Sequence, residues 1–258
     1  MNEPTLLVLE SALLREKGFR HAFFTRRGGV SVPPWDTLSF VTTTGDDPAA
    51  VLENRRRAAR HLGVPVERLY YPSQVHGTAS ARLDGTEDWD AVLHSIGDIT
   101  LARVPGVGCA VRSADCVPVL LGDLRSGAVA AIHSGWKGTV ANVVNAAIQA
   151  LREVIGAEPD LVAAVGPHLE RCCFEVGDDV AAALAACSTA GARAVIPGPK
   201  AHVDLRIVIR AQLESAGVAS AHIEDVAGCT GCDAERFFSY RREGQVSGRL
   251  LSGIATRG

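Results

Sequence analysis

Apolar positions along this chain follow two different spacings, and each spacing predicts a different kind of element. The runs VPVLL at residues 117–121 and AVAAI at residues 128–132 are unbroken, which is typical of strands buried on both faces. Residues 139–155 instead repeat apolar side chains every three or four positions, and Gly156 follows as a stop signal. The middle of the chain is therefore predicted to form two strands joined by a polar turn and followed by an amphipathic helix.

Shorter segments extend these patterns along the rest of the chain. Strands are predicted at residues 19–25, 68–77, 79–83, 89–93, 160–165, 222–226 and 249–255. Helices are predicted to begin after Asp47, Gly177 and Asp204, and residues 189–200 are predicted to be a loop around a short apolar strand. This mixture of strands and helices predicts an α/β protein.

The helix after Asp47 carries a run of arginines. Its apolar stripe contains Val51, Leu52, Ala58, Ala59 and Leu62. The arginines lie mostly off that stripe and are expected on a solvated face: Arg55, Arg56, Arg57 and Arg60. Glu53 and Arg57 are four positions apart, so they are placed to form a helical ion pair.

Composition limits the class of protein. A length of 258 residues with 47% hydrophobic content fits one α/β domain with a large core, so a single catalytic domain at residues 1–258 is expected. A net charge of -3 gives no electrostatic reason to expect nucleic acid. No apolar run approaches the roughly 18 residues that cross a bilayer, and the first residues lack a basic and apolar leader pattern. We expect a cytoplasmic protein that acts on small molecules, without a membrane, nucleic acid or an obligate protein partner.

Three soft ligands occur where predicted strands begin or end. His76 closes the segment at residues 68–77, Cys116 precedes VPVLL, and His133 follows AVAAI. Each alone is unremarkable, because single histidines are usually structural and single cysteines usually buried. Together they form a Cys/His/His set, and zinc held by three protein ligands keeps a fourth position open for water or substrate. We therefore predict a catalytic metal site at His76, Cys116 and His133.

The turn after His133 has the features of an anion site. Gly135 and Gly138 let backbone N–H groups approach a ligand, and Lys137 adds a positive charge. The predicted helix follows at once, and the N-terminus of a helix favours anions. We predict that phosphate binds at this turn, beside the metal.

Three further residues are candidates for the same site. Gln74 lies two positions before His76 and is expected on the same side of the strand. Asp115, next to Cys116, either acts as an acid or base or caps a turn. Arg26 belongs to an Arg-Arg-Gly-Gly loop that either holds an anion or forms a solvated turn.

The remaining cysteines do not indicate a disulfide framework. The chain has seven cysteines, an odd number, and two of them are adjacent at Cys172 and Cys173. Cys229 and Cys232 have CxxC spacing, but no second CxxC completes a four-thiolate zinc site. Reduced thiols are expected, and the lone CxxC is weak evidence for a metal.

Several motifs, taken in order, resemble one known family. The segments PSQVHG, SADCVPVLL, AAIHSGWKGT, CCFEVG and CTGCDAERFFSYRR resemble the YfiH-type family, zinc-dependent purine nucleoside phosphorylases formerly labelled laccase-domain or polyphenol oxidase proteins. The resemblance spans nearly the whole chain. It implies mixed β-sheets flanked by helices in a four-layer αββα arrangement. It also implies that His76, Cys116 and His133 are the metal ligands, because they occupy the ligand positions of the family motifs.

The resemblance implies an activity as well. This activity is phosphorolysis of adenosine, inosine and methylthioadenosine to the free base and a pentose 1-phosphate, with adenosine deamination as a second reaction. One zinc ion with an open position is implied, and copper is the less favoured metal. The chain departs from the usual family pattern at Ser39, His168 and Phe174, which is expected to alter the pocket wall.

Three other functions are alternatives for the same residues. A copper oxidase is disfavoured, because blue-copper sites often add an axial Met while the only methionine here is Met1, and because no His-x-His pair is present. A metal-independent cysteine hydrolase or amidase, of the peptidoglycan-editing type, would use Cys116 as nucleophile and His133 as base. A zinc-stabilised binding protein would lose stability but no turnover on metal removal. Metal content and chelator-sensitive activity distinguish these functions.

Overall fold

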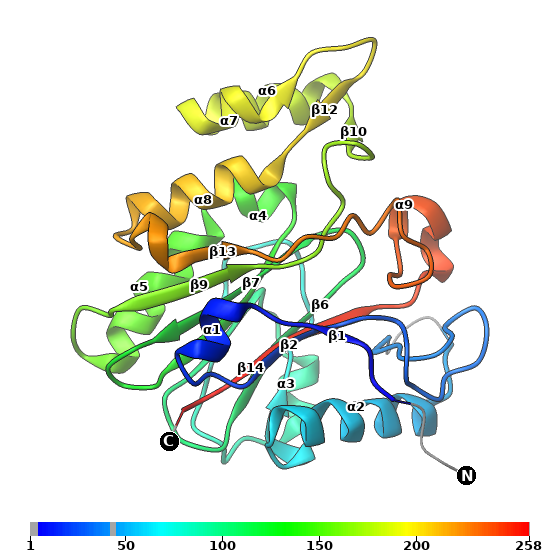
Figure 1. The fold of residues 1–258 in the computed structure, drawn as a ribbon, viewed down its shortest axis with the longest axis vertical. Helices are drawn as coiled ribbons and strands as arrows, with labels where there is room; N and C mark the ends of the chain where they lie inside the picture. Colours follow the sequence, from blue (N-terminus) through cyan, green and yellow to red (C-terminus); the bar gives the residue numbers. More distant parts are fainter. Residues whose placement is uncertain (1–4, 42–44, 258) are drawn as a thin grey trace.

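The computed structural model describes residues 5–41 and 45–257, so both ends of the predicted 1–258 domain lie outside the described residues (Figure 1). Its largest sheet has six strands in the order β13-β9-β7-β8-β5-β4. Their bounds are β4 (Ser80–Leu83), β5 (Ile99–Ala102), β7 (Val117–Asp123), β8 (Val129–Ser134), β9 (Leu161–Val165) and β13 (Ile223–Asp225). β7 pairs antiparallel with β8 and β9, whereas β4 and β13 pair parallel with their neighbours, so this sheet is mixed.

Two smaller sheets accompany it. The five-stranded sheet has the order β1-β2-β14-β6-β3 and consists of β1 (Val8–Leu9), β2 (His21–Phe24), β3 (Leu69–Tyr70), β6 (Gly108–Ser113) and β14 (Leu250–Ala255). The three-stranded sheet consists of β10 (Glu175–Val176), β11 (Val195–Ile196) and β12 (Ala201–Val203). The five-stranded sheet is also mixed, because β3 pairs parallel with β6.

Helices connect and cover these sheets. The α-helices are α1 (Ala12–Glu16), α2 (Pro48–Leu62), α3 (Trp89–His94), α4 (Trp136–Val140), α5 (Val143–Ile155), α6 (Asp178–Cys187), α7 (Thr189–Ala194), α8 (Leu205–Ser215) and α9 (Tyr240–Glu243). Short 3-10 turns are η1 (Val66–Arg68), η2 (Ser220–His222) and η3 (Gly244–Val246).

The two large sheets are stacked between helices. α2 and α3 pack on the outer face of the five-stranded sheet, through an apolar cluster that includes Leu62, Leu93 and Phe24. The facing sides of the two sheets meet through a second cluster that includes Phe23 and Leu120. α5 and α8 cover the outer face of the six-stranded sheet, and α6 and α7 lie beyond them (Figure 1). The predicted four-layer αββα arrangement is confirmed.

Burial of both sheet faces explains the unbroken apolar runs. Val119 and Leu121 face the α5 layer, whereas Leu120 between them faces the other sheet. Successive side chains on a strand point to opposite faces, so a strand in the middle of four layers needs apolar residues at every position. The predicted strands VPVLL and AVAAI are accordingly β7 and β8.

The predicted central helix is divided in two. α5 begins at Val143 and not at residue 139, because Asn142 adopts left-handed backbone angles (φ 57, ψ 50). Its side chain caps the new helix by accepting a hydrogen bond from the Asn145 N–H at 3.3 Å. The short α4 therefore lies between His133 and the long helix, and Gly156 ends α5 as predicted.

Two segments predicted as strand or loop are helical instead. Residues 89–93 belong to α3, whose first turn is capped by the Asp88 carboxylate accepting from the Ala91 N–H at 2.9 Å. α7 lies within the predicted loop and is capped by Ser188. Short apolar runs are ambiguous between strand and short helix, and in these two segments a capping side chain stabilises the helix.

The predicted strand at residues 68–77 forms a strand only at Leu69–Tyr70, followed by one isolated bridge between Ser73 and Ile96. Pro72 cannot donate a ladder hydrogen bond, which limits pairing beyond that point. The segment that carries His76 is consequently a loop and not a strand.

The arginine face of α2 is not uniformly solvated. Arg55 and Arg57 are buried, while Leu52, predicted in the apolar stripe, is 39% exposed. The Arg55 guanidinium lies 3.6 Å from the centroid of the Trp89 ring, and Arg57 donates to the Gly28 carbonyl at 2.8 Å. The predicted ion pair of Arg57 with Glu53 is confirmed, at 3.1 Å.

Candidate metal centre and pocket

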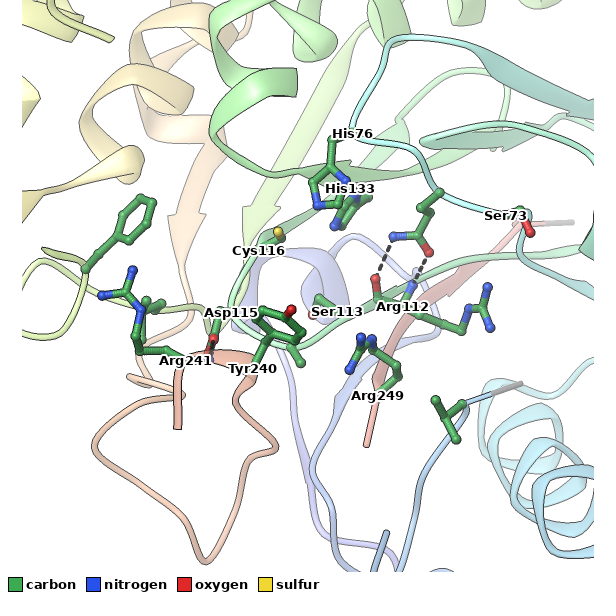
Figure 2. Close-up of a pocket in the computed structure, with 15 residues that line it drawn as sticks. Ser73, His76, Arg112, Ser113, Asp115, Cys116, His133, Tyr240, Arg241 and Arg249 are labelled. Atoms are coloured by element: carbon green, nitrogen blue, oxygen red, sulfur yellow. Dashed lines mark hydrogen bonds between the residues drawn. The ribbon is translucent and has the colours of Figure 1, made fainter. Parts of the chain in front are cut away.

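The three predicted metal ligands converge. His76 lies in the loop after β3, Cys116 directly precedes β7, and His133 lies near the end of β8. Their ligand atoms all lie within 4.8 Å of one another, and the two imidazole centroids are 4.9 Å apart (Figure 2). Antiparallel pairing brings this about, because Pro118 is opposite His133 in the register of β7 and β8.

The backbone around the ligands is unusual. His76 and Asp115 have positive φ angles of 63 and 95 degrees, although neither is glycine. A Cβ atom at Gly135 would lie 2.7 Å from Cδ2 of His76 and 3.0 Å from Sγ of Cys116. Only glycine fits there, so the turn after β8 closes directly over the ligand set.

Asp98, which the sequence analysis did not single out, orients two of the ligands. Its fully buried carboxylate accepts from Nδ1 of His133 at 2.8 Å and from the His76 backbone N–H at 2.9 Å. The N–H groups of Val75 and Gly77 also donate to it, at 3.1 and 2.7 Å. A carboxylate that holds Nδ1 leaves Nε2 for a metal, which is the common outer-shell arrangement at metal sites. The sequence feature that could have indicated Asp98 is its position, as an acidic residue directly before the buried strand β5.

The protonation states of Cys116 and His133 depend on each other. Burial would raise the pKa of the Cys116 thiol, but the adjacent His133 and His76 lower it to about 6. Burial would lower the pKa of His133, but the Cys116 thiolate and the Asp98 carboxylate raise it to about 9. The protein groups therefore favour a thiolate at Cys116, the form in which cysteine binds metals and acts as a nucleophile.

The ligand set lies where two pockets meet. The larger pocket has a volume of about 620 Å³, and its wall includes residues from both large sheets and from the C-terminal segment. An adjoining pocket of about 270 Å³ shares His76, Cys116, Leu169 and Phe174 with it. The set is thus open to space in which a small molecule fits.

The larger pocket contains cationic and aromatic groups that the sequence analysis missed. Arg249 and Tyr240 face the ligand set from the C-terminal segment, while Arg112 and Ser113 belong to β6 (Figure 2). Arg249 keeps its place by donating from Nη1 to the Ser247 and Gly248 carbonyls, at 2.8 and 3.0 Å. Arg112 could have been noticed in the sequence as the one charged residue of the β6 segment GCAVRS. Tyr240 lies in the FFSYRR motif, to which the sequence analysis assigned no role.

Two predicted substrate ligands have other partners. Gln74 lines the larger pocket, but its amide forms two hydrogen bonds with the Arg112 backbone, at 2.6 and 2.8 Å (dashed in Figure 2). Arg26 pairs with Asp36 at 3.1 Å and Glu243 at 3.4 Å, and it is absent from the described walls of both pockets. Gln74 therefore lies in the pocket wall with its amide already engaged, Arg26 lies outside both described walls, and a substrate-binding role for either residue stays a prediction.

The other predicted substrate residues lie at or beside the smaller pocket. Gly135 and Lys137 line it, and the exposed Lys137 ammonium is 5.6 Å from the Trp136 ring centroid. Gly138 is buried behind them in α4. Asp115 lines both pockets, but its two oxygens accept from Oγ1 of Thr230 and from the Arg241 N–H, each at 2.6 Å.

The three departures from the family pattern have different positions. Phe174 lines both pockets, so this departure lies in their wall. Ser39 is buried behind the wall, where its hydroxyl accepts from the Arg249 N–H at 3.4 Å. His168 is buried with Nδ1 at 2.8 Å from the Gly166 carbonyl.

Comparison with known proteins identifies the family of this chain. Residues 20–257 match the family described as multi-copper polyphenol oxidoreductase laccase. The chain belongs to this family. Purine nucleoside phosphorylase ORF3 of Streptomyces griseus is 40% identical over 90% of this chain and 93% of its own length. Adenosine deaminase RL5, from an unknown prokaryotic organism, is 35% identical over 90% and 92%.

Solved structures show the same fold. The hypothetical protein YfiH of Bacillus licheniformis aligns with a TM-score of 0.87 at 27% identity, covering 98% of this chain and 97% of that one. YlmD of Geobacillus stearothermophilus aligns with a TM-score of 0.84 at 29% identity, covering 96% and 94%. The resemblance to the YfiH-type family is confirmed. Across the described residues, no helix combines the length and apolar character needed to cross a membrane.

Proposed function

We propose that this protein is a zinc-dependent purine nucleoside phosphorylase that also deaminates adenosine. The observation that carries the proposal is the His76, Cys116 and His133 set, which opens onto a pocket of about 620 Å³ with cationic walls. Relatives named for both reactions support it. We infer that adenosine, inosine and methylthioadenosine are the substrates.

The ligand chemistry fits zinc. Two imidazoles and one thiolate are zinc donors, and a catalytic zinc retains an open position, which a molecule in the adjoining pockets would reach. Blue-copper electron-transfer sites use a similar donor set but add a weak axial ligand, often Met, and the single methionine lies outside the described residues. Among residues 5–41 and 45–257, the other potential metal group consists of four cysteines, so the histidine-rich surroundings of a multicopper cluster are missing there. When bound, the metal would supply a Lewis acid beside the substrate.

The two pockets differ in chemistry, which suggests how a nucleoside binds. Trp136 and Leu205 line only the smaller one, and together with the shared Leu169 and Phe174 they give it an apolar wall suited to a purine ring. The larger one contains Arg112 and other cationic groups suited to ribose and phosphate. The nucleoside would lie across the ligand set, with its base on one side and its sugar on the other.

Two groups of residues are candidates for holding phosphate. The first is the predicted turn of Gly135, Lys137 and Gly138, and the second is Arg249, whose guanidinium faces the ligand set (Figure 2). Lys137→Ala and Arg249→Gln distinguish them. The variant that raises the KM for phosphate with unchanged zinc content identifies the phosphate ligand, and we expect the larger effect at Arg249 because guanidinium binds phosphate in a bidentate manner. Arg236→Gln, at a 40% exposed side chain, is the control.

Asp115 has a positioning role in this proposal. Its carboxylate already accepts two hydrogen bonds from the C-terminal segment, at Thr230 and Arg241. These hydrogen bonds hold the part of the pocket wall that carries Tyr240. Both carboxylate oxygens are engaged in them, so Asp115 would not act as a catalytic acid or base. Cys116 and His133 hold the metal, and Asp98 keeps the His133 imidazole oriented.

One experiment tests the activity directly. Zinc-loaded protein is incubated with adenosine, with and without phosphate, and the products are separated by chromatography. We expect adenine and ribose 1-phosphate only when phosphate is present, and inosine in either case. Absence of all three products from zinc-loaded protein would contradict the proposal.

The second candidate is a cysteine hydrolase, favoured by the lowered pKa of Cys116 beside His133. It requires no metal, so chelation would leave its activity intact while alkylation of Cys116 would abolish it. The nucleoside enzyme predicts the opposite response to chelation, namely loss of turnover that added zinc restores.

A further inference from the structure

A second group of metal-binding side chains lies beside the pocket. Cys172 and Cys173 follow β9 in a turn, and Cys229 and Cys232 follow β13. Their sulfur atoms all lie within 4.8 Å of one another, and we call this group the cysteine cluster. The sequence analysis found no second CxxC to complete the Cys229 and Cys232 pair. The fold supplies the missing pair from the adjacent cysteines instead.

The spacing fits a single tetrahedral ion. The Cys172 sulfur lies 3.5 Å from that of Cys229 and 3.6 Å from that of Cys232, and the Cys173 sulfur lies 3.3 Å from that of Cys232. Four thiolates at 2.3 Å from zinc stand about 3.8 Å apart, and a disulfide would need about 2.05 Å. We propose that the cysteine cluster binds a second zinc ion, which is structural and distinct from the one at the pocket.

The surroundings suit a closed four-thiolate site. A Cβ atom at Gly231 would lie 2.9 Å from Cβ and 3.0 Å from Sγ of Cys173, so glycine is required for the two loops to approach this closely.

Nearby cations offset the charge of such a site. Four thiolates around Zn²⁺ carry two net negative charges. Arg241 donates to the Cys173 carbonyl at 3.4 Å and to the Glu175 carbonyl at 2.8 Å. Arg242 donates to the carbonyls of the other loop, at Thr230 and Gly231. Both guanidinium groups are therefore anchored to the loops that carry the cysteines.

The second zinc would stabilise the pocket wall. The first cysteine pair lies between Leu169 and Phe174, which line both pockets. The second pair flanks Thr230, whose hydroxyl donates to Asp115 beside the ligand set. Cross-linking these loops fixes one side of the substrate pocket, so the second zinc acts on the site through structure and without contacting substrate.

Zinc stoichiometry tests this proposal without reference to activity. Native mass spectrometry of zinc-loaded protein should show two zinc ions per chain. Cys116→Ser should leave one ion, held by the cysteine cluster, and the double variant Cys229→Ser with Cys232→Ser should also leave one, held at the pocket. Cys187→Ser is the matched control, since this partly buried cysteine lies on α6 outside both groups, and it should keep two ions.

The double cysteine variant could lose zinc because it misfolds, so a second measurement leaves the cysteine cluster intact. Cobalt(II) replaces zinc in four-thiolate sites and gives intense thiolate-to-metal absorption. The Cys116→Ser protein titrated with cobalt(II) should keep most of this absorption, and bound metal should protect the exposed Cys172 and Cys232 from alkylation. Three results would overturn the proposal: a single zinc per chain that Cys116→Ser removes, loss of the cobalt absorption in Cys116→Ser, or disulfide bonds within the cluster, seen as a loss of two hydrogens per cysteine pair in the mass of the denatured protein.

Discussion

At the scale of single residues, the metal centre depends on groups that do not themselves bind the metal. Asp98 holds His133 and the loop of His76 in place through four hydrogen bonds. Gly135 leaves the space that the Cys116 sulfur and the His76 ring occupy. Each of these residues can therefore be changed without removing a ligand, which separates orientation from ligation.

Asp98→Asn should weaken zinc binding by roughly 10- to 100-fold, as is usual when an outer-shell partner is lost. The amide keeps the size of the side chain but cannot accept four hydrogen bonds as a carboxylate does. Competition with a fluorescent chelator measures the affinity. Asp90→Asn, at an exposed aspartate on α3, is the control, and equal affinities in the two variants would show that Asp98 does not orient the ligands.

Gly135→Ala should abolish zinc binding at the pocket, because the added methyl would lie within 3.0 Å of both His76 and Cys116. Gly138→Ala is the matched control, since the nearest atom to its added Cβ is 3.4 Å away, an ordinary contact. Zinc content of the two purified variants gives the answer, and full occupancy in Gly135→Ala would refute the steric argument.

At the scale of elements, polar side chains connect α2 and β7 to their neighbours. Arg55 on α2 donates to the carbonyls of Val66 and Leu69 and lies over Trp89. Asp123 at the end of β7 accepts from the N–H groups of the following turn and of the segment that enters β9. These contacts fix where the helix and strand meet their neighbours, which apolar packing alone leaves unspecified.

Arg55→Ala should lower the free energy of unfolding by about 2–4 kcal/mol, because it leaves buried carbonyls unpaired and uncovers Trp89. Arg56→Ala, at the exposed neighbour on the same helix, should change it by less than about 0.5 kcal/mol. Denaturant unfolding of both variants measures the difference. Equal losses would mean that the α2 arginines act as a solvated face after all.

Asp123→Asn should destabilise the protein at neutral pH by about 1–3 kcal/mol. Burial would raise the pKa of Asp123, but hydrogen bonds from Ser126 and the Asp160 N–H lower it below its ordinary value. The ionised form is thus preferred in the folded state, and its stabilisation is present above pH of about 4 and lost as the pH falls further. Unfolding curves from pH 7 to pH 3 should therefore converge for wild type and variant. The exposed Asp160→Asn is the control, and a constant difference across this pH range would contradict the argument.

At the scale of the whole molecule, the pocket is assembled from segments that are far apart in sequence. β6, the turn between β6 and β7, and β8 supply one side of it, and the C-terminal segment around Tyr240 and Arg249 supplies the opposite side (Figure 2). Asp115 joins these parts through its bonds to Thr230 and Arg241. Substrate binding is therefore expected to depend on how firmly the C-terminal segment is held.

Asp115→Asn should raise the KM for the nucleoside by about tenfold and change kcat by less than about threefold, because an amide oxygen replaces only part of the acceptor capacity of the carboxylate. Asparagine also tolerates the positive φ of this position. Steady-state kinetics at constant zinc occupancy provide the test, with Asp178→Asn on α6 as control. A collapse of kcat at unchanged KM would make Asp115 an acid or base instead of a positioning residue.

The sequence by itself determined those features that depend on neighbouring residues. Unbroken apolar runs identified β7 and β8 as strands covered on both faces, and Asp47 and Gly156 marked helix ends, because capping and burial act over a few positions. The three metal ligands could be proposed from residue type and position at predicted strand ends. Residues such as WDAVL at 89–93 were misassigned, since a short apolar run does not distinguish strand from helix without its cap.

Only the tertiary structure decided which distant groups meet. Asp98 approaches His133 through the pairing of β5 with β8, and the second cysteine pair reaches the first through the parallel pairing of β13 with β9. The hydrogen-bond partners of Gln74 and Arg26, which are Arg112 and Asp36, are likewise set by the fold and not by local spacing. Sheet register and loop packing depend on residues far apart in sequence. The sequence therefore identifies candidate ligands, but the distances between them are set only by the folded structure.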